Sequence, residues 1–259
     1  MTQRAGHATA GLAPHPLRGV LFDLDGTLVD TVADIRMALN RTLNEIGCNG
    51  VSLATTRDLI GRGAPALIAR ALERQDVDIE AEVRERLHER FVVHYHAIHE
   101  RHESAAVAFP GAHDALAGLR AAGLGLGVVT NKQRSLAVCT LEAVGLARLV
   151  NVILGGDSCA RRKPHPDPLL SAAEALGVIP PETLVIGDSI NDVTAARAAG
   201  MAVWCVPYGY NEGQDPRLLP CDAFIESLAE LPELLRGARA ELAIAAPREA
   251  GPPTGNPAG

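Results

Sequence analysis

The chain has 259 residues, a net charge of −7 and 47% hydrophobic residues, which is enough apolar material for one large or two modest globular domains. This composition excludes a wholly disordered protein and a small scaffold held together by disulfides. The acidic balance disfavours nucleic acid as a partner, because no general basic field is available to attract phosphate backbones. Aromatic residues make up only 3% of the chain, which disfavours stacking surfaces for bases.

Cysteine usage and the absence of long apolar runs predict a cytoplasmic protein. The cysteines are odd in number, lie far apart and form no CxxC motif, so we expect reduced, inert thiols. They are Cys48, Cys139, Cys159, Cys205 and Cys221. No run approaches the roughly 18 apolar residues of a membrane span, and the N-terminal stretch has no apolar core typical of a secretion signal. We therefore expect no membrane contact.

The predicted elements begin with a short apolar strand at 19–24. Helical spacing follows over 31–47 and over 55–103, with no convincing strand. From residue 112 onward helices and strands alternate. The expected elements are helix 112–122, strand 124–130, helix 133–145, strand 151–154, a helix from an Asp167 cap to Gly177, strand 183–186, helix 190–199 and strand 201–206. This order predicts an α/β fold, a Rossmann-like parallel-sheet core with helices on both faces.

The long helical stretch interrupts the alternation after the first strand, so it is interpreted as an inserted α-helical cap domain. The predicted organisation is a flexible leader at 1–17, a core formed by 18–30 and 106–236, a cap at 31–105 and a disordered tail at 237–259. The tail is rich in Ala, Pro and Gly, a composition that cannot bury enough apolar surface to order itself.

Two acidic residues end the first strand. Ligands of α/β sheets bind beyond the carboxyl ends of the strands, so Asp23 and Asp25 lie where a site is expected. Residues i and i+2 of an extended chain point the same way, which turns Leu24 away from the site. Two neighbouring carboxylates repel unless a proton or a cation lies with them. The alternative is an ordinary polar strand end followed by an Asp-Gly turn.

A second acidic group follows strand 183–186. Asp188 stands at the strand end, and Asp192 falls in the first turn of the next helix. Ser189 and Asp192 also match a capping box, which would explain both of them without a ligand but would leave Asp188 unexplained. Oxygen donors from two strand ends form a hard site of the kind that suits Mg²⁺.

Candidate phosphate ligands follow strand 124–130 and occupy a later loop. Thr130 and Asn131 offer a hydroxyl and backbone N–H groups, although an ordinary helix cap is the alternative. Lys163 precedes a proline, which disfavours helical backbone, and its ammonium is a candidate partner for an anion. A solvated basic loop at 161–166 is the alternative there.

Together these residues resemble the motifs of the haloacid dehalogenase-like (HAD) hydrolase superfamily. The matching segments are DLDGT at 23–27, VVTN at 128–131, KPHPDP at 163–168 and GDSIND at 187–192, in the family order. The insert after the first motif matches the position of the family's C1 cap. The resemblance covers roughly residues 18–235.

The resemblance implies roles for these residues. Asp23 would be the nucleophile that forms an aspartyl-phosphate, and Asp25 would protonate the leaving alcohol and then activate water. Mg²⁺ would be held by Asp23, the backbone carbonyl of Asp25, and Asp188. Asp192 would support the ion through water or through Lys163. Thr130, the backbone of Asn131, and Lys163 would hold the phosphoryl oxygens.

The resemblance also narrows the range of possible substrates. Dehalogenases lack an acid at the position of Asp25, so its presence favours a phosphate ester. Phosphonate hydrolysis would need a cap lysine, and the two lysines of the chain, Lys132 and Lys163, lie outside the predicted cap. The segments GRGAPALIARAL, KPHPDP and YGYNEG favour 2-phosphoglycolate as substrate, and Arg62 in the first of them is a candidate partner for its carboxylate.

Alternatives stay open at this point. A phosphatase or phosphomutase acting on another small sugar phosphate would share the same core. A signalling receiver domain also places acids, a Thr and a Lys around a phosphorylated Asp, although it needs neither the DxD pair nor a cap. The expected partner is a small phosphorylated metabolite, with no nucleic acid and no membrane, and the expected assembly is a monomer or small homo-oligomer.

Overall fold

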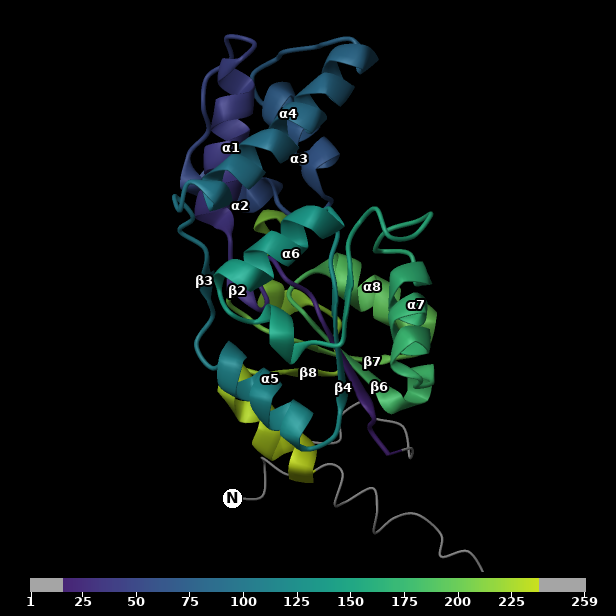
Figure 1. The fold of residues 1–259 in the computed structure, drawn as a ribbon. Helices are drawn as coiled ribbons and strands as arrows, with labels where there is room; N and C mark the ends of the chain where they lie inside the picture. Colours follow the sequence, from purple (N-terminus) through teal and green to yellow (C-terminus); the bar gives the residue numbers. More distant parts are fainter. Residues whose placement is uncertain (1–15, 238–259) are drawn as a thin grey trace, which may run out of the picture.

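The computed structural model describes residues 16–237 and has a helical layer above a sheet-containing body (Figure 1). The predicted leader at 1–17 and the predicted tail at 237–259 fall almost wholly outside the described residues. Within residues 16–237, no helix is both long and apolar enough to cross a membrane.

The body is built on a six-stranded, fully parallel sheet. Its strand order is β5-β4-β1-β6-β7-β8, with β1 in register between β4 and β6. The strands are β1 (Gly19–Phe22), β4 (Gly125–Val129), β5 (Val152–Leu154), β6 (Thr183–Gly187), β7 (Ala202–Cys205) and β8 (Ala223–Phe224). The α/β fold class predicted from the alternation of elements is confirmed.

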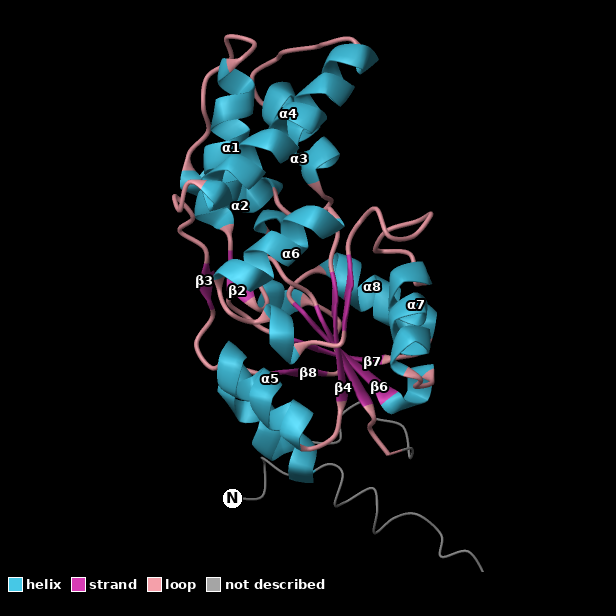
Figure 2. Ribbon diagram, viewed as in Figure 1, coloured by secondary structure: helices cyan, strands magenta, loops and turns pink. Residues whose placement is uncertain are grey.

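Helices cover both faces of this sheet (Figure 2). Val20 and Phe22 of β1 pack in one core cluster with residues of α5 (Ala112–Ala121) and α6 (Arg134–Ala143). Leu21 lies between them in sequence and packs in another cluster with residues of α7 (Asp167–Leu176) and α8 (Ile190–Ala199). Because both faces are buried, the strand is a continuous apolar run instead of an alternating one.

The helical layer has a core of its own. It contains α1 (Val32–Asn44), α2 (Leu53–Leu59), α3 (Ala64–Glu73) and α4 (Ala81–Glu100). Leu39, Ile68 and Phe91 are fully or almost fully buried in a cluster that also takes in Leu136 of α6 and Tyr210. The layer therefore packs directly on the body, above the carboxyl ends of β1 and β4.

The chain enters and leaves this layer through a short antiparallel pair, β2 (Val29–Asp30) and β3 (Val107–Ala108). The predicted cap, residues 31–105, lies between these two strands. The pair was not predicted, because two-residue strands are too short to show any periodicity.

Local details differ from the sequence-based expectations. Strand β1 ends at Phe22, not residue 24, because the Leu24 carbonyl turns to accept hydrogen bonds from the amides of Leu28 and Val29. Asp167 does not cap α7 as predicted; it is the first helical residue and pairs with Arg161 (Nε to Oδ2, 2.8 Å). The other end of α7 is as expected, at a left-handed Gly177.

Candidate active site

Asp23 and Asp25 follow β1 and line a cavity of about 50 Å³ between the body and the helical layer. The Asp23 amide donates to the Ile186 carbonyl at 2.9 Å, which holds this residue at the edge of the sheet. Leu24, between the two acids, is fully buried in the core below. The expected arrangement, with both acids on one side and Leu24 on the other, is therefore present.

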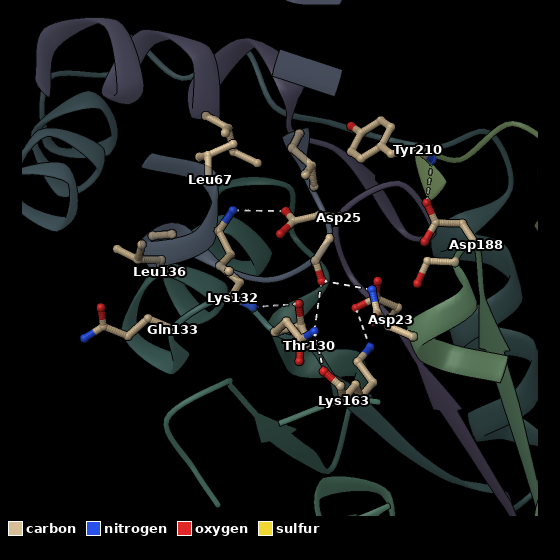
Figure 3. Close-up of a pocket in the computed structure, with 18 of the residues that line it drawn as sticks. Asp23, Asp25, Leu67, Thr130, Lys132, Gln133, Leu136, Lys163, Asp188 and Tyr210 are labelled. Carbon is tan, nitrogen blue, oxygen red and sulfur yellow. Dashed lines mark hydrogen bonds and ion pairs between the residues drawn. The ribbon is translucent and has the colours of Figure 1, made fainter. Parts of the chain in front are cut away.

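Asp23 also belongs to a buried acidic cluster. One carboxylate oxygen each from Asp23, Asp188 and Asp192 lies within 4.8 Å of the others. Asp188 is held by the Tyr210 amide at 2.6 Å (Figure 3) and by the Thr27 hydroxyl at 3.3 Å.

Asp192 serves two purposes at once. Its Oδ2 accepts the Ser189 hydroxyl at 2.6 Å and the Ser189 amide at 3.1 Å, so the capping interaction predicted from sequence is present. Its Oδ1 faces Lys163. The helix-capping interpretation and the site interpretation are therefore compatible, because the two oxygens of one carboxylate are used separately.

Two glycines leave the space around Asp188. A Cβ atom on Gly26 would overlap the Asp188 carboxylate, and one on Gly209 would overlap its side chain as well. Gly26 also has a φ of 92°, which L side chains rarely adopt. The acidic cluster thus depends on backbone that passes directly against it.

Lys163 lies beneath this cluster and is 4% exposed. Its Nζ is 2.6 Å from Asp192 Oδ1, donates to the Val129 carbonyl at 2.6 Å and is 2.9 Å from Asp23 Oδ1. The contact with Asp23 is an ion pair without hydrogen-bond geometry, so that buried oxygen has no hydrogen-bond partner. The solvated-loop alternative is therefore wrong for Lys163.

Burial sets the electrostatics of the acids. It raises the pKa of Asp23 to about 6, an effect that Lys163 opposes and that Asp192 and Asp25 reinforce. Burial likewise raises the pKa of Asp188 well above its ordinary value, with Asp23 and Asp192 adding to the effect. Both shifts mean that, without a metal ion, the site disfavours the ionised forms of Asp23 and Asp188.

The charge balance fits a divalent cation. More carboxyl groups than ammonium groups lie in and around the cavity, which favours the binding of a cation. The groups counted are Asp23, Asp25, Asp188 and Asp192 against Lys132 and Lys163. Carboxylate oxygens are the donors that hard cations take, and the unpartnered Oδ1 of Asp23 offers one directly. Asp23 and Asp188 are the stronger candidates to bind such an ion, because both oxygens of Asp192 are hydrogen-bonded, one to Lys163 and the other to Ser189.

Thr130 and Asn131 follow β4 and line the same cavity. The Thr130 hydroxyl accepts the Lys132 amide at 3.2 Å. The Asn131 side chain donates to the carbonyls of Gly61 (2.9 Å) and Lys163 (3.0 Å). Sequence reasoning singled out the backbone of Asn131, but its side chain also ties the α2–α3 loop to the body.

Asp25 has a partner that sequence reasoning missed. Lys132 Nζ lies 3.0 Å from Asp25 Oδ1, and the Thr31 hydroxyl donates to the same oxygen at 2.6 Å. The ammonium also lies 4.3 Å from the centroid of the Tyr95 ring on α4. The available signal was that Lys132, one of two lysines in the chain, stands two residues after Thr130.

The structure does not bring Arg62 into the cavity. Its side chain is 62% exposed, and its Nε pairs with Glu212 Oε1 at 2.9 Å. Gly61 and Gly63 line the cavity instead. The expected contact between Arg62 and a substrate is not available from this position, because the side chain reaches across to the body outside the cavity. Glu212 also accepts the Arg70 guanidinium at 3.3 Å, so it joins two helical-layer arginines to the body.

The wall of the cavity opposite the acids is apolar. Its side chains come from three helices of the upper layer, from the α2–α3 loop and from α6, and they are Ile35, Ile60, Leu67, Phe91 and Leu136. The small volume and dry wall suit a ligand with only a short organic part.

Comparisons with known proteins agree with this geometry. A family model described as haloacid dehalogenase-like hydrolase matches residues 20–206. The chain is 40% identical over 224 residues to a phosphoglycolate phosphatase of Nitrosospira multiformis, covering 86% of this chain and 97% of that protein. It is 38% identical over 231 residues to a phosphoglycolate phosphatase of Escherichia coli K12, covering 83% and 91%.

Solved structures show the same likeness. A crystal structure of a predicted phosphoglycolate phosphatase from Haemophilus somnus has a TM-score of 0.77 at 29% identity, covering 84% of this chain and 97% of that chain. CbbY from Rhodobacter sphaeroides, in complex with phosphate, has a TM-score of 0.72 at 28% identity, covering 83% and 96%. The receiver-domain alternative is therefore wrong: the chain belongs to the haloacid dehalogenase-like hydrolase family.

Proposed function

We propose that the protein is a Mg²⁺-dependent phosphatase that hydrolyses 2-phosphoglycolate to glycolate and phosphate through a phosphorylated Asp23. The observation that carries the proposal is that the buried Oδ1 of Asp23 has no hydrogen-bond partner and that Asp23 shares a small cavity with Asp25 and Lys163. Curated relatives with 37–42% identity named phosphoglycolate phosphatase support the choice of substrate.

The phosphoryl group is assigned to the edge of the sheet where β1, β4 and β6 end. Lys163 offsets its negative charge, while the Thr130 hydroxyl and the Asn131 backbone amide orient its oxygens. Mg²⁺ would be held by Asp23, the backbone carbonyl of Asp25, and Asp188, and it would neutralise charge on the carboxylate and the phosphoryl oxygens. This assembly keeps Asp23 ionised, as a nucleophile requires.

The reaction then takes two displacements at phosphorus. An Asp23 carboxylate oxygen forms a bond to phosphorus as the ester P–O bond breaks, and Asp25 gives its proton to the departing glycolate oxygen. In the second step Asp25 removes a proton from a water molecule whose oxygen attacks the same phosphorus. The bond between phosphorus and Asp23 breaks, which releases phosphate and restores the carboxylate.

The apolar upper wall limits which water molecules reach the intermediate. The small cavity, of about 50 Å³, supports a small phosphorylated metabolite as the substrate. We place the reaction in the cytoplasm, with no nucleic-acid or membrane partner; the five cysteines, all free in the structure, are consistent with a reducing compartment.

A panel of small phosphate esters, assayed for phosphate release with Mg²⁺ and with EDTA, tests the proposal. 2-Phosphoglycolate should be the preferred substrate, and EDTA should abolish turnover. Asp23→Asn should eliminate activity, whereas Asp78→Asn, which changes a fully exposed aspartate far from the cavity, is the matched control. Full activity in Asp23→Asn would refute the covalent mechanism.

A sugar phosphate is the second candidate substrate. A further structure of CbbY, in complex with xylulose-(1,5)bisphosphate, has a TM-score of 0.71 at 27% identity. A higher kcat/KM on glucose 1-phosphate or another sugar phosphate than on 2-phosphoglycolate would favour this candidate, with the core chemistry unchanged.

A further inference from the structure

Both lysines of the chain line the cavity, but they have different surroundings. Lys163 meets three oxygen atoms, one each from Asp23, Asp192 and the Val129 carbonyl. Two of its three N–H donors make hydrogen bonds, to Asp192 and to the Val129 carbonyl, and its ion pair is with the Asp23 carboxylate. Lys163 is therefore committed to the Asp23 side of the site.

Lys132 is also buried, with 7% of its surface exposed. Its ammonium makes a hydrogen bond to one carboxylate, that of Asp25. Its other neighbour is the Tyr95 side chain, whose ring centroid lies 4.3 Å from the ammonium and attracts the cation. Tyr95 is itself fixed by a 3.0 Å hydrogen bond between its hydroxyl and that of Thr140 on α6. The ammonium is thus held in place between α4 and the body.

The position of Lys132 relates it to the leaving group. In the proposed reaction Asp25 contacts the ester oxygen, and Lys132 lies beside Asp25, while Lys163 lies on the Asp23 side (Figure 3). A 2-phosphoglycolate carboxylate is separated from the ester oxygen by a single methylene carbon. A group that close to the ester oxygen falls beside Asp25, within the surroundings of Lys132.

The rest of the cavity offers that carboxylate no other cation. Its upper wall is apolar, and no arginine is among the described residues that line it. Arg62 and Arg70 are paired with Glu212, and Arg57 donates to the carbonyls of Tyr208 and Gly209. An anionic leaving group placed against Ile60 and Leu67 would therefore lose its nearby cation if Lys132 were removed, which is unfavourable in a buried position.

We propose that Lys132 is the specificity residue of this enzyme, binding the carboxylate of the leaving group while it stays in contact with Asp25. The inference rests on the proposed phosphatase function and assigns to Lys132 the role that sequence reasoning gave to Arg62. The three donors of the ammonium allow it to bind both carboxylates together. A charge-assisted hydrogen bond in a dry cavity discriminates strongly against a substrate that lacks the charge.

The test compares 2-phosphoglycolate with 2-hydroxyethyl phosphate, in which a hydroxymethyl group replaces the carboxylate. The readout is the ratio of kcat/KM for 2-phosphoglycolate to kcat/KM for 2-hydroxyethyl phosphate, with Mg²⁺ present. Lys132→Met keeps most of the length of the side chain and removes its charge, and it should lower this ratio by about 10- to 100-fold. The change should appear mainly in KM for the acid.

Arg62→Met is the matched variant, because it removes a cation from the other candidate residue. The proposal is overturned if Arg62→Met lowers the ratio and Lys132→Met does not, or if the wild-type enzyme shows no preference for the acid. If the methionine variant folds poorly, Lys132→Ala with added ethylammonium gives a second test. Ethylammonium should restore more activity on 2-phosphoglycolate than on 2-hydroxyethyl phosphate. Equal restoration of activity on both substrates counts against the proposal.

These outcomes are separate from failure of the proposed function. If a sugar phosphate is the better substrate of the wild-type enzyme, the assigned substrate is wrong, yet the ratio for Lys132→Met still reports whether Lys132 recognises a carboxylate. If neither ester releases phosphate, the phosphatase proposal fails and the role of Lys132 fails with it.

Discussion

Replacing the proposed nucleophile should stabilise the metal-free protein at neutral pH. Burial raises the pKa of Asp23 to about 6 from an ordinary value of 3.8. Between those values the folded protein retains a proton on Asp23 that the unfolded chain has lost, so the free energy of unfolding falls as pH rises from about 4 to 6. At about 1.4 kcal/mol for each pKa unit, the full cost above pH 6 is about 3 kcal/mol.

Asp23→Asn removes this cost, because the amide carries no charge at any of these pH values. In EDTA at pH 7, urea unfolding should show the variant to be more stable than wild type by about 3 kcal/mol, and the difference should shrink towards zero near pH 4. The difference between the two proteins cancels titrating groups that do not interact with Asp23, such as His99, whose pKa is lowered by burial and whose effect on stability has the opposite sign. Asp188 does not cancel, because the Asp23 charge contributes to its raised pKa, and its relief in the variant acts in the same direction.

Mg²⁺ provides the counterpart measurement. Saturating Mg²⁺ should stabilise wild type far more than Asp23→Asn, because only wild type keeps the unpartnered carboxylate oxygen. A pH-independent stability difference in EDTA would refute the burial argument for Asp23. Equal stabilisation of both proteins by Mg²⁺ would refute the placement of the ion at this carboxylate.

Three further changes test other parts of the site. Lys163→Met leaves Asp192 buried without its cation, so urea unfolding should show that the free energy of unfolding falls by about 3–5 kcal/mol, and activity should be lost as well. A free energy of unfolding close to that of wild type would contradict the geometry. Gly209→Ala places a Cβ against Asp188, and a Mg²⁺ titration of activity should show weaker activation than in wild type; an unchanged titration would show that the loop yields without cost. Glu212→Gln weakens the ion pairs that join the helical layer to the body, so hydrogen exchange should rise in the α2–α3 loop and KM should increase a few-fold; unaltered exchange would mean that the ion pairs do not control closure.

Local sequence patterns were enough to predict the order of elements and the positions of the principal acids. Strand β1 is apolar on both faces because it is buried on both faces, and such runs alternating with helical spacing predict a parallel sheet. The carboxyl ends of parallel strands meet at one edge, so Asp23 and Asp188 could be placed together although 165 positions separate them. Sequence motifs were sufficient here because each strand end can be recognised locally and all of the strand ends lie at the same edge of the sheet.

Which side chains surround those acids depends on the folded arrangement of distant segments. Lys132, Tyr210 and Glu212 contact residues that are remote in sequence, and their local sequence pattern does not show which residues they contact. Arg62, between two glycines, was predicted to face the substrate, yet it reaches Glu212 because the loop presents its backbone, not this side chain, to the cavity. Side-chain direction in a loop depends on packing between distant segments, and short-range sequence patterns do not encode that packing.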